Sequence, residues 1–202
     1  MSETVDSAQT PRKSGGAANE FIEIVKTIVY ALLIALFLRV LFFQPFTIPS
    51  ASMEPNLYEG DYIIVSKFSY GYSRHSAPFS PPIMTGRVLE KPAQRGDIVV
   101  FKLPSDGHTD YVKRVIGVGG DRVQMKNGLL YVNDKLVQRD PLSPVKTDLG
   151  FGQITEVARF QERLESGKTY VTQDMGPDGQ LDNTETFIVP AGFYFMMGDN
   201  RD

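Results

Sequence analysis

The chain has 202 residues and a formal net charge of −3, which does not favour nucleic acid as a partner. It contains no cysteine, and this excludes disulfides, cysteine nucleophiles and thiolate metal sites. Its 18 glycines, 13 prolines and 11% aromatic residues favour a turn-rich β protein over a helical bundle.

The N-terminal part combines a polar tail with an apolar run. Residues 1–20 are small and polar, which predicts a disordered segment. The run from Thr27 to Phe43 is apolar apart from Arg39, and as a helix it would span roughly 25 Å. We therefore predict one transmembrane helix over 27–45, preceded by a tail over 1–26. A signal sequence cleaved near residues 50–52 and a buried soluble helix are the alternatives.

The distribution of basic residues predicts the orientation of this helix. Arg12, Lys13 and Lys26 precede the apolar run, and after Arg39 the next basic residue is Lys67. The positive-inside rule then puts the N-terminus in the cytoplasm and the bulk of the chain outside the membrane.

From Phe46 onward the sequence alternates between short strands and turns. The expected strands are rich in β-branched and aromatic residues and fall within 61–68, 96–103, 111–118, 121–125 and 193–197. Asn133-Asp134 is a hairpin turn pair between two further strands. A proline-rich loop covers 73–86, and a polar, irregular region covers about 140–185. We predict a mainly β domain over 46–202, with an antiparallel catalytic core and a smaller inserted β subdomain at about 127–185.

Two serines follow the apolar run in the segment "FTIPSASMEPNLYEGD". A serine between prolines is commonly a turn or cap residue. As a nucleophile, Ser52 would need a base within hydrogen-bond reach. His75 and His108 are the histidines of the chain, and both lie in polar loop segments. The remaining candidate base is a lysine.

Lys113 lies in the otherwise apolar stretch "YVKRVIGVGGD". Strand alternation puts Lys113 and Arg114 on opposite faces, so that one can face solvent while the other faces inward. A lysine acts as a base near neutral pH only when its pKa falls from about 10.4 to roughly 7–8. Apolar neighbours can cause such a shift by desolvation. The alternative is a lysine that extends from a strand edge into water.

Four blocks of the chain together resemble the bacterial type I signal peptidases, which are membrane-bound serine–lysine endopeptidases. The blocks occur in the family's order: "PSASMEPNLYEGD", "RGDIVVFK", "YVKRVIGVGGD" and "YFMMGDNRD". The resemblance implies that Ser52 is the nucleophile, that Lys113 is the general base, and that Ser50 lends its hydroxyl to the oxyanion hole. It also implies candidate pocket walls at Ile48, Met53 and Val112.

The resemblance further implies substrates, location and cofactors. The substrates would be the signal peptides of exported preproteins, cut after small residues in an A-x-A pattern at the outer surface of the bacterial inner membrane. Membrane lipid would be a partner, and neither a metal nor an organic cofactor would be required. No feature of the sequence indicates an oligomeric state. Pro49 and Pro55 would stiffen an extended segment from which Ser50 and Ser52 project on the same side.

The chain departs from the family pattern at its end. The family's last block continues past "GDNRD" with residues that help to position the lysine, whereas this chain stops at Asp202. We therefore expect Lys113 to be poorly held and the activity to be lower than that of a longer version. A membrane-anchored β domain that binds a partner or a signal segment without cleaving it is the alternative from another functional class.

Two further motifs have competing interpretations. Residues 174–185 partly match a calcium-binding loop, but Gly176 replaces a ligand and the flanks look like strands, which favours a polar turn. The tripeptide Arg-Gly-Asp at 95–97 is a short adhesion motif, and a turn at the entry to a strand is the simpler interpretation.

Overall fold

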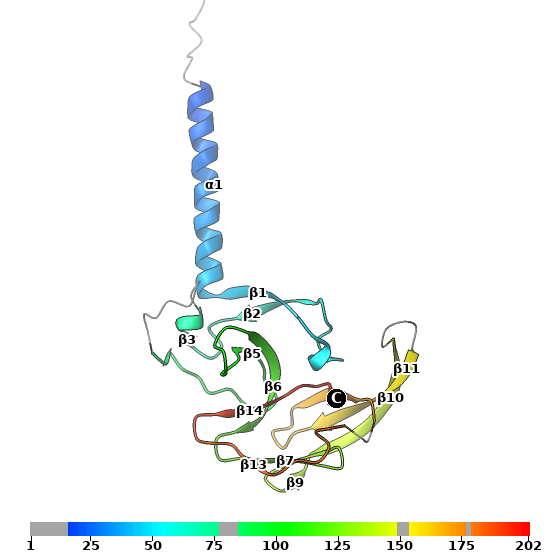
Figure 1. Ribbon diagram of the computed structural model, residues 1–202. Coiled ribbons are helices and arrows are strands. Elements are labelled where there is room, and N and C mark those ends of the chain that lie inside the picture. Colours follow the sequence, from blue (N-terminus) through cyan, green and yellow to red (C-terminus); the bar gives the residue numbers. More distant parts are fainter. Residues whose placement is uncertain (1–15, 77–84, 149–153, 177–178) are drawn as a thin grey trace, which may run out of the picture.

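The computed structural model describes residues 16–76, 85–148, 154–176 and 179–202. In this part of the chain one α-helix, α1 (Gly16–Leu41), projects from a body built of short β-strands (Figure 1). The prediction of a mainly antiparallel β fold behind an N-terminal apolar helix is confirmed.

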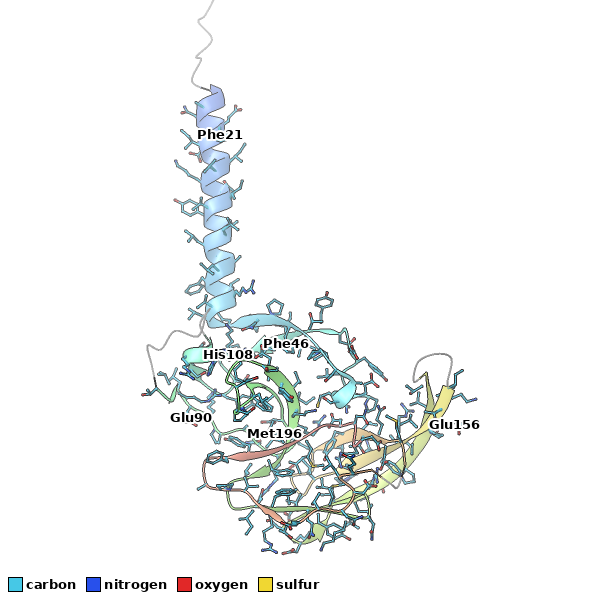
Figure 2. The ribbon with its side chains drawn as sticks, in the orientation of Figure 1. Phe21, Phe46, Glu90, His108, Glu156 and Met196 are labelled. Carbon is cyan, nitrogen blue, oxygen red and sulfur yellow. The ribbon has the colours of Figure 1, made fainter. Side chains whose placement is uncertain are left out.

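Helix α1 is longer and starts earlier than the apolar run predicts. Its segment Ala18–Leu41 has a mean hydropathy of 2.3 and is exposed along most of its length (Figure 2), and it is long and apolar enough to cross a membrane. At 1.5 Å per residue it spans roughly 36 Å. The helix takes in 16–26, because alanines favour helix and polar residues are tolerated in its first turns. It ends at Leu41 and not at 45, because Pro45 belongs to a strand.

The strands pair antiparallel in five small sheets within the described residues. The two-stranded sheets are β1 (Phe43–Thr47) with β2 (Tyr62–Ser66), and β3 (Tyr72–Ser73) with β4 (Arg87–Val88). The sheet that carries the candidate base has the order β14-β6-β5, from β5 (Ile98–Lys102), β6 (Asp110–Val118) and β14 (Tyr194–Met197). The largest has the order β13-β7-β8-β9, from β7 (Arg122–Lys126), β8 (Leu129–Val132), β9 (Lys135–Leu136) and β13 (Phe187–Ile188). The last has the order β10-β11-β12, from β10 (Gln138–Asp148), β11 (Ile154–Arg163) and β12 (Thr169–Asp174).

The five strands expected from β-branched runs are all present as β2, β5, β6, β7 and β14. The hairpin turn is also confirmed: Asn133 and Asp134 join β8 to β9 with φ values of 53° and 62°, which a type I′ turn requires. Of the proline-rich loop, residues 77–84 lie outside the described residues. The described ends of this loop are β3, the 3-10 turn η2 (Arg74–Ser76) and β4.

The expectation of an irregular region over 140–185 is wrong for most of it. Strands β10 and β11 form a long antiparallel ribbon, with a register shift between Leu142 and Val145, and β12 pairs along β11. The sequence looked irregular because most of β10 is exposed, so polar residues occupy positions that are apolar in a core strand.

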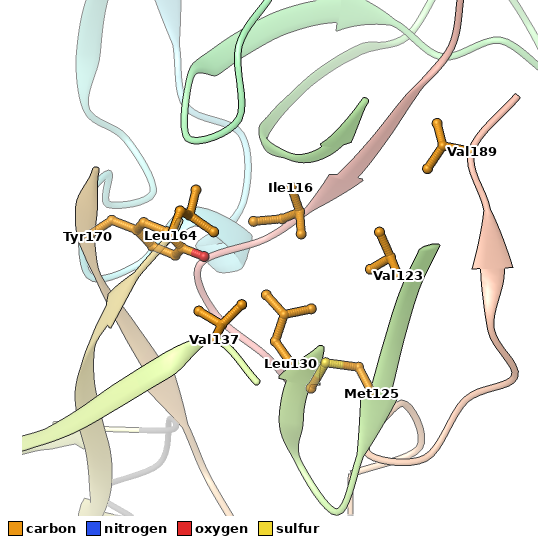
Figure 3. Close-up of a cluster of buried hydrophobic side chains, with 8 residues drawn as sticks. All are labelled: Ile116, Val123, Met125, Leu130, Val137, Leu164, Tyr170 and Val189. Carbon is orange, nitrogen blue, oxygen red and sulfur yellow. The ribbon is translucent and has the colours of Figure 1, made fainter. Parts of the chain in front are cut away.

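Two clusters of buried side chains hold the β domain together. The larger one joins β6, β7, β8, β12 and the adjoining loops (Figure 3); its members are Ile116, Val123, Met125, Leu130, Val137, Leu164, Tyr170 and Val189. The smaller one consists of Ile48, Met53 and Val112, with Phe46, Leu57, Ile63 and Val100 packed around it. This second cluster ties the segment after β1 to β5 and β6, and so brings the serines close to the strand of Lys113.

Replacement of a core leucine tests the larger cluster. Leu130 is 2% exposed and Leu136, six residues later, is 52% exposed. We expect Leu130→Ala to lower the free energy of unfolding by about 2–5 kcal/mol, because it removes buried methyl groups and leaves a cavity. Leu136→Ala is the matched control and should melt like the wild type when thermal unfolding is followed by circular dichroism in detergent. Equal destabilisation by both substitutions would contradict the assignment of the core.

Candidate functional site

The two serines lie on a short turn that continues from β1. Ile48 still pairs in an extended manner, because its N–H donates to the Asp61 carbonyl at 2.9 Å. Ser50 is extended, with φ −158° and ψ 157°, and the 3-10 turn η1 (Ala51–Met53) follows. The prediction of a wholly extended segment is therefore wrong at Ser52, where the chain turns so that Met53 can be buried. The two hydroxyls are nevertheless adjacent, with 3.2 Å between Ser50 Oγ and Ser52 Oγ.

Lys113 lies in the middle strand of the β14-β6-β5 sheet, opposite Val99 of β5. Its side chain is partly buried, and within the described residues its ammonium group forms neither a hydrogen bond nor an ion pair. Burial lowers the pKa of Lys113, and the negative charge of Asp199 opposes this shift without cancelling it. Burial therefore makes the neutral amine, the form that can accept a proton, easier to reach than in an exposed lysine.

Gly198, directly after β14, brings the serine and the lysine together. A methyl group added at Gly198 would collide with the carbonyl oxygen of Ser52 and would lie 3.4 Å from Lys113 Nζ. The backbone of Ser52 and the amine of Lys113 thus contact the same glycine from different elements. Any larger residue at 198 would push the turn of Ser52 away, so the close approach requires glycine here.

Two cavities of about 400 Å³ each meet at these residues, and Ser52 and Lys113 line both of them. The first runs between the serine turn and the start of β6, and its walls include the three predicted pocket residues, Ile48, Met53 and Val112. The second lies on the other side and is largely apolar, with Phe187, Phe195 and Met197 among its walls. A chain lying across both cavities would pass directly over Ser52.

Arg114, next to Lys113 in sequence, is also buried, so neither of the two residues simply faces solvent. Its guanidinium binds the Asp199 carboxylate through two hydrogen bonds of 2.7 Å, and a third bond of 2.7 Å goes to the Gly96 carbonyl. Asn56 donates to Asp199 at 2.8 Å. Burial raises the pKa of Asp199, while the bonds from Arg114 and Asn56 act in the opposite direction. This ion pair connects β6, the segment after β14 and the segment after the serine turn.

The residues around Gly198 brace the serine turn further. The N–H of Asn200 donates to the Ser52 carbonyl at 3.2 Å, and Arg201 binds the buried Glu162 carboxylate at 2.6 Å. Tyr170 donates to the same carboxylate at 2.8 Å. Residues of the last block therefore brace the serine turn, whereas the expectation that Lys113 is poorly held stays a prediction. The supporting residues Asn200 and Arg201 belong to the block "YFMMGDNRD" that the sequence analysis had identified. Nothing in that block indicated that they would contact Ser52 and Glu162.

The competing interpretations of other motifs receive no support from the geometry. Neither His75 nor His108 is among the residues that line the two cavities, which argues against a serine–histidine pair. In the adhesion-like tripeptide, Arg95 is bound to Asp121 and Asp97 accepts bonds from Tyr70 and Lys168.

The calcium-like segment lies between two strands, β12 and β13, as the sequence suggested. Asp174 is paired with Arg139 at 2.8 Å, and Asp182 accepts a bond from the Gly179 N–H at 2.9 Å. Residues 177–178 lie outside the described part of the chain. Within the part that is described, no group of three His, Asp or Glu side chains is arranged to hold a metal ion.

A serine hydroxyl and a lysine amine of lowered pKa that line the same cavities are the groups that a serine hydrolase with a lysine base uses. Comparison with known proteins agrees with this class. Residues 21–202 match the family model described as signal peptidase, peptidase S26. The chain belongs to this family of peptidases.

Several relatives named "Signal peptidase I" are similar over most of the chain. The protein from Rickettsia canadensis (strain McKiel) is 38% identical over 185 residues, which cover 88% of this chain and 68% of that protein. The protein from Rickettsia typhi (strain ATCC VR-144 / Wilmington) is 40% identical over 181 residues, which cover 86% and 67%. The chain thus spans about two thirds of the length of these relatives.

The lowered pKa of Lys113 predicts a pH-dependent stability. Because the folded pKa lies below the unfolded value, the unfolded chain binds more protons between these two values, and stability rises with pH in that window. We expect the wild type to gain stability relative to Lys113→Met as the pH rises from neutral towards 10.5. Denaturant unfolding at several pH values measures this difference. Lys126→Met, at an exposed position, is the control and should follow the wild type; a constant difference between wild type and Lys113→Met would contradict the prediction.

Removal of the Asp199 carboxylate tests the buried ion pair. Asp199→Ala leaves the Arg114 guanidinium buried without its partner, which typically costs about 3–5 kcal/mol of unfolding free energy. The matched control is Glu165→Ala, which breaks the exposed pair with Lys135 and should leave the melting temperature nearly unchanged. Similar melting temperatures for both variants would show that the Arg114–Asp199 pair does not hold the site together.

Proposed function

We propose that this chain is a membrane-anchored serine endopeptidase that removes signal peptides from exported preproteins. The observation that carries the proposal is the meeting of Ser52 and Lys113 at Gly198, where both side chains line two adjoining cavities. Membership of the signal peptidase family and relatives named "Signal peptidase I" support the same reaction.

In the proposed reaction Ser52 Oγ attacks the carbonyl carbon of the scissile peptide while Lys113 Nζ takes its proton. The tetrahedral intermediate then collapses, the carbon–nitrogen bond breaks, and Lys113 returns the proton to the leaving amine. Water attacks the resulting ester with Lys113 again as base, which releases the signal peptide and restores the Ser52 hydroxyl. Residues of the chain perform every step of this sequence, and no metal or organic cofactor enters it.

The intermediate carries a negative oxygen that needs hydrogen-bond donors. We assign this role to the Ser50 hydroxyl together with the backbone N–H of Ser52. The 3.2 Å separation of the two serine hydroxyls supports the assignment, because a carbonyl carbon attacked by Ser52 would hold its oxygen near Ser50.

The first cavity is the proposed site for the residues that precede the cut. Its buried apolar walls, Ile48, Met53 and Val112, suit small apolar side chains such as those of the A-x-A pattern. The second cavity, beyond Ser52, then lies on the side of the leaving amine.

The membrane arrangement completes the proposal. Helix α1 would span the bacterial inner membrane once, with the N-terminus in the cytoplasm as Arg12, Lys13 and Lys26 indicate. The β domain would then lie outside the cytoplasm. Ser52 follows the helix end at Leu41 by so few residues that even extended chain keeps it within roughly 35 Å of the bilayer surface. The cleavage site at the end of a signal peptide that is held in the bilayer would lie at a similar distance from the membrane surface.

Cleavage of a purified preprotein with an A-x-A site, in detergent and across a range of pH, tests the proposal. We expect turnover by the wild type that increases through an ionisation below that of free lysine, because only the neutral Lys113 amine accepts the proton. Ser52→Ala and Lys113→Met should each abolish turnover. Ser50→Ala should reduce it about 10²–10³-fold, the usual effect of losing one oxyanion donor.

A second serine pair provides the matched control. Ser66 and Ser69 have hydroxyls 2.8 Å apart and do not line either cavity. Ser69→Ala should therefore cleave at the wild-type rate. Full activity of Ser52→Ala would refute the assignment of the nucleophile. Binding of the preprotein without any turnover by the wild type would favour the alternative of a non-cleaving membrane-anchored domain.

A further inference from the structure

A group of basic side chains gathers where the β domain meets the end of α1. We call it the juxtamembrane basic cluster; its members are Arg39, Lys67, Arg74, Arg87 and Lys102. Two electrostatic effects show their proximity. The charge of Arg39 helps to lower the pKa of Lys67, and the charges of Arg74, Lys102 and Arg87 help to lower that of His75, in each case after the larger effect of burial.

Hydrogen bonds fix this cluster to the end of the helix. The Tyr72 hydroxyl donates to the Leu41 carbonyl at 2.8 Å, and the Lys67 N–H donates to the Phe42 carbonyl at 2.9 Å. The Lys67 ammonium donates to the Ser76 carbonyl at 2.6 Å, which connects it to the turn of Arg74. Figure 1 shows β3 directly below the end of α1.

The turn that follows β5 belongs to the same region. Lys102 donates to the His108 carbonyl at 2.7 Å, and its charge acts on His75 together with those of Arg74 and Arg87. The cluster therefore lies close to the point at which the chain would leave a bilayer.

The cluster is poorly neutralised by acidic residues. In the described part of the chain Lys102 is its one member with a carboxylate partner, Asp110 at 2.9 Å. Arg74 and Arg87 are exposed, and the bonds of Arg87 are to backbone carbonyls of Tyr70 and Gly71. Elsewhere in the domain many arginines contact carboxylates; these are Arg95, Arg114, Arg122, Arg139 and Arg201.

An exposed apolar face lies next to the cluster. On the outer side of the β1–β2 sheet Pro45 pairs with Ile64, and Thr47 pairs with Tyr62. Ile64 is 74% and Tyr62 is 84% exposed. At the end of the sheet next to α1, the rings of Phe43 and Phe68 pack edge to face. At a membrane surface, such apolar side chains can contact the acyl chains while the neighbouring basic side chains contact the headgroups.

We propose that the juxtamembrane basic cluster binds the phosphate groups of anionic phospholipids and thereby orients the β domain, with its Ser52 cleft, against the bilayer. The proposal rests on the proposed function in one respect, namely that α1 spans a membrane. Clusters of four or more basic residues beside a membrane helix are attracted by anionic headgroups, and the attraction weakens with salt.

The absence of cysteine from the chain allows a direct test. A single Ser105→Cys substitution, in the exposed turn after Lys102, carries a fluorescent donor, and the vesicle lipids carry headgroup acceptors. The full chain is reconstituted in vesicles of phosphatidylcholine alone or with phosphatidylglycerol. We expect higher transfer efficiency in the phosphatidylglycerol vesicles at low salt, and loss of this difference at high salt. The double variant Arg74→Gln/Arg87→Gln, which removes the two exposed arginines of the domain's part of the cluster, should show a clearly smaller difference between the two lipid mixtures than the wild type.

A control variant removes two charges elsewhere. Lys126→Gln/Lys146→Gln, at exposed positions of β7 and β10, should respond to phosphatidylglycerol like the wild type. An equal response by Arg74→Gln/Arg87→Gln, or no response by the wild type, would overturn the proposal. Preprotein cleavage in detergent is measured on the same samples, so a failure of the proposed peptidase activity is seen separately from a failure of the lipid response.

Discussion

The buried ion pair between Arg114 and Asp199 is the interaction on which the site depends. Its two hydrogen bonds join the middle of β6 to the segment after β14, and Asn56 extends the connection to the residues after the serine turn. A charge pair removed from water is stable only when its hydrogen bonds are satisfied, and here Gly96 and Asn56 complete them. Because three separate segments end at this pair, the position of Gly198 is determined, and with it the approach of Ser52 to Lys113.

The strand geometry of β6 gives its two neighbouring cations opposite roles. Successive side chains point to opposite faces, so Arg114 is directed into the interior while Lys113 reaches the cavities. The Arg114 guanidinium binds the Asp199 carboxylate through two hydrogen bonds. The amine of Lys113 has no such partner in the described residues, and burial shifts it towards the neutral form. One strand therefore supplies both a residue of the rigid support, Arg114, and the proposed base, Lys113.

The connection between the helix and the domain would relate this site to the membrane that we propose α1 to span. Helix α1 passes into β1 after a single residue, and β1 leads directly to the serine turn. The aromatic rings of Phe42, Phe43 and Phe68 pack together at this junction. A short, packed connection limits how far the domain can tilt away from the helix.

The sequence by itself predicted much of the fold and the chemistry of the candidate site. Alternating β-branched residues indicated the strands, and Asn133-Asp134 indicated the turn of a hairpin. The run around Arg39 indicated an apolar helix. All three patterns could be recognised because they depend on residues that are neighbours in the chain. The motifs of Ser52 and Lys113 indicated a serine–lysine pair through resemblance to a known family. Only the tertiary structure showed that the chain leaves the extended conformation at Ser52 and that β10 and β11 form a ribbon. It also showed that Asp199 and Arg201 brace the site. These features depend on contacts between residues far apart in the sequence, such as Arg114 with Asp199, and no local pattern specifies which distant partner a buried charge will meet.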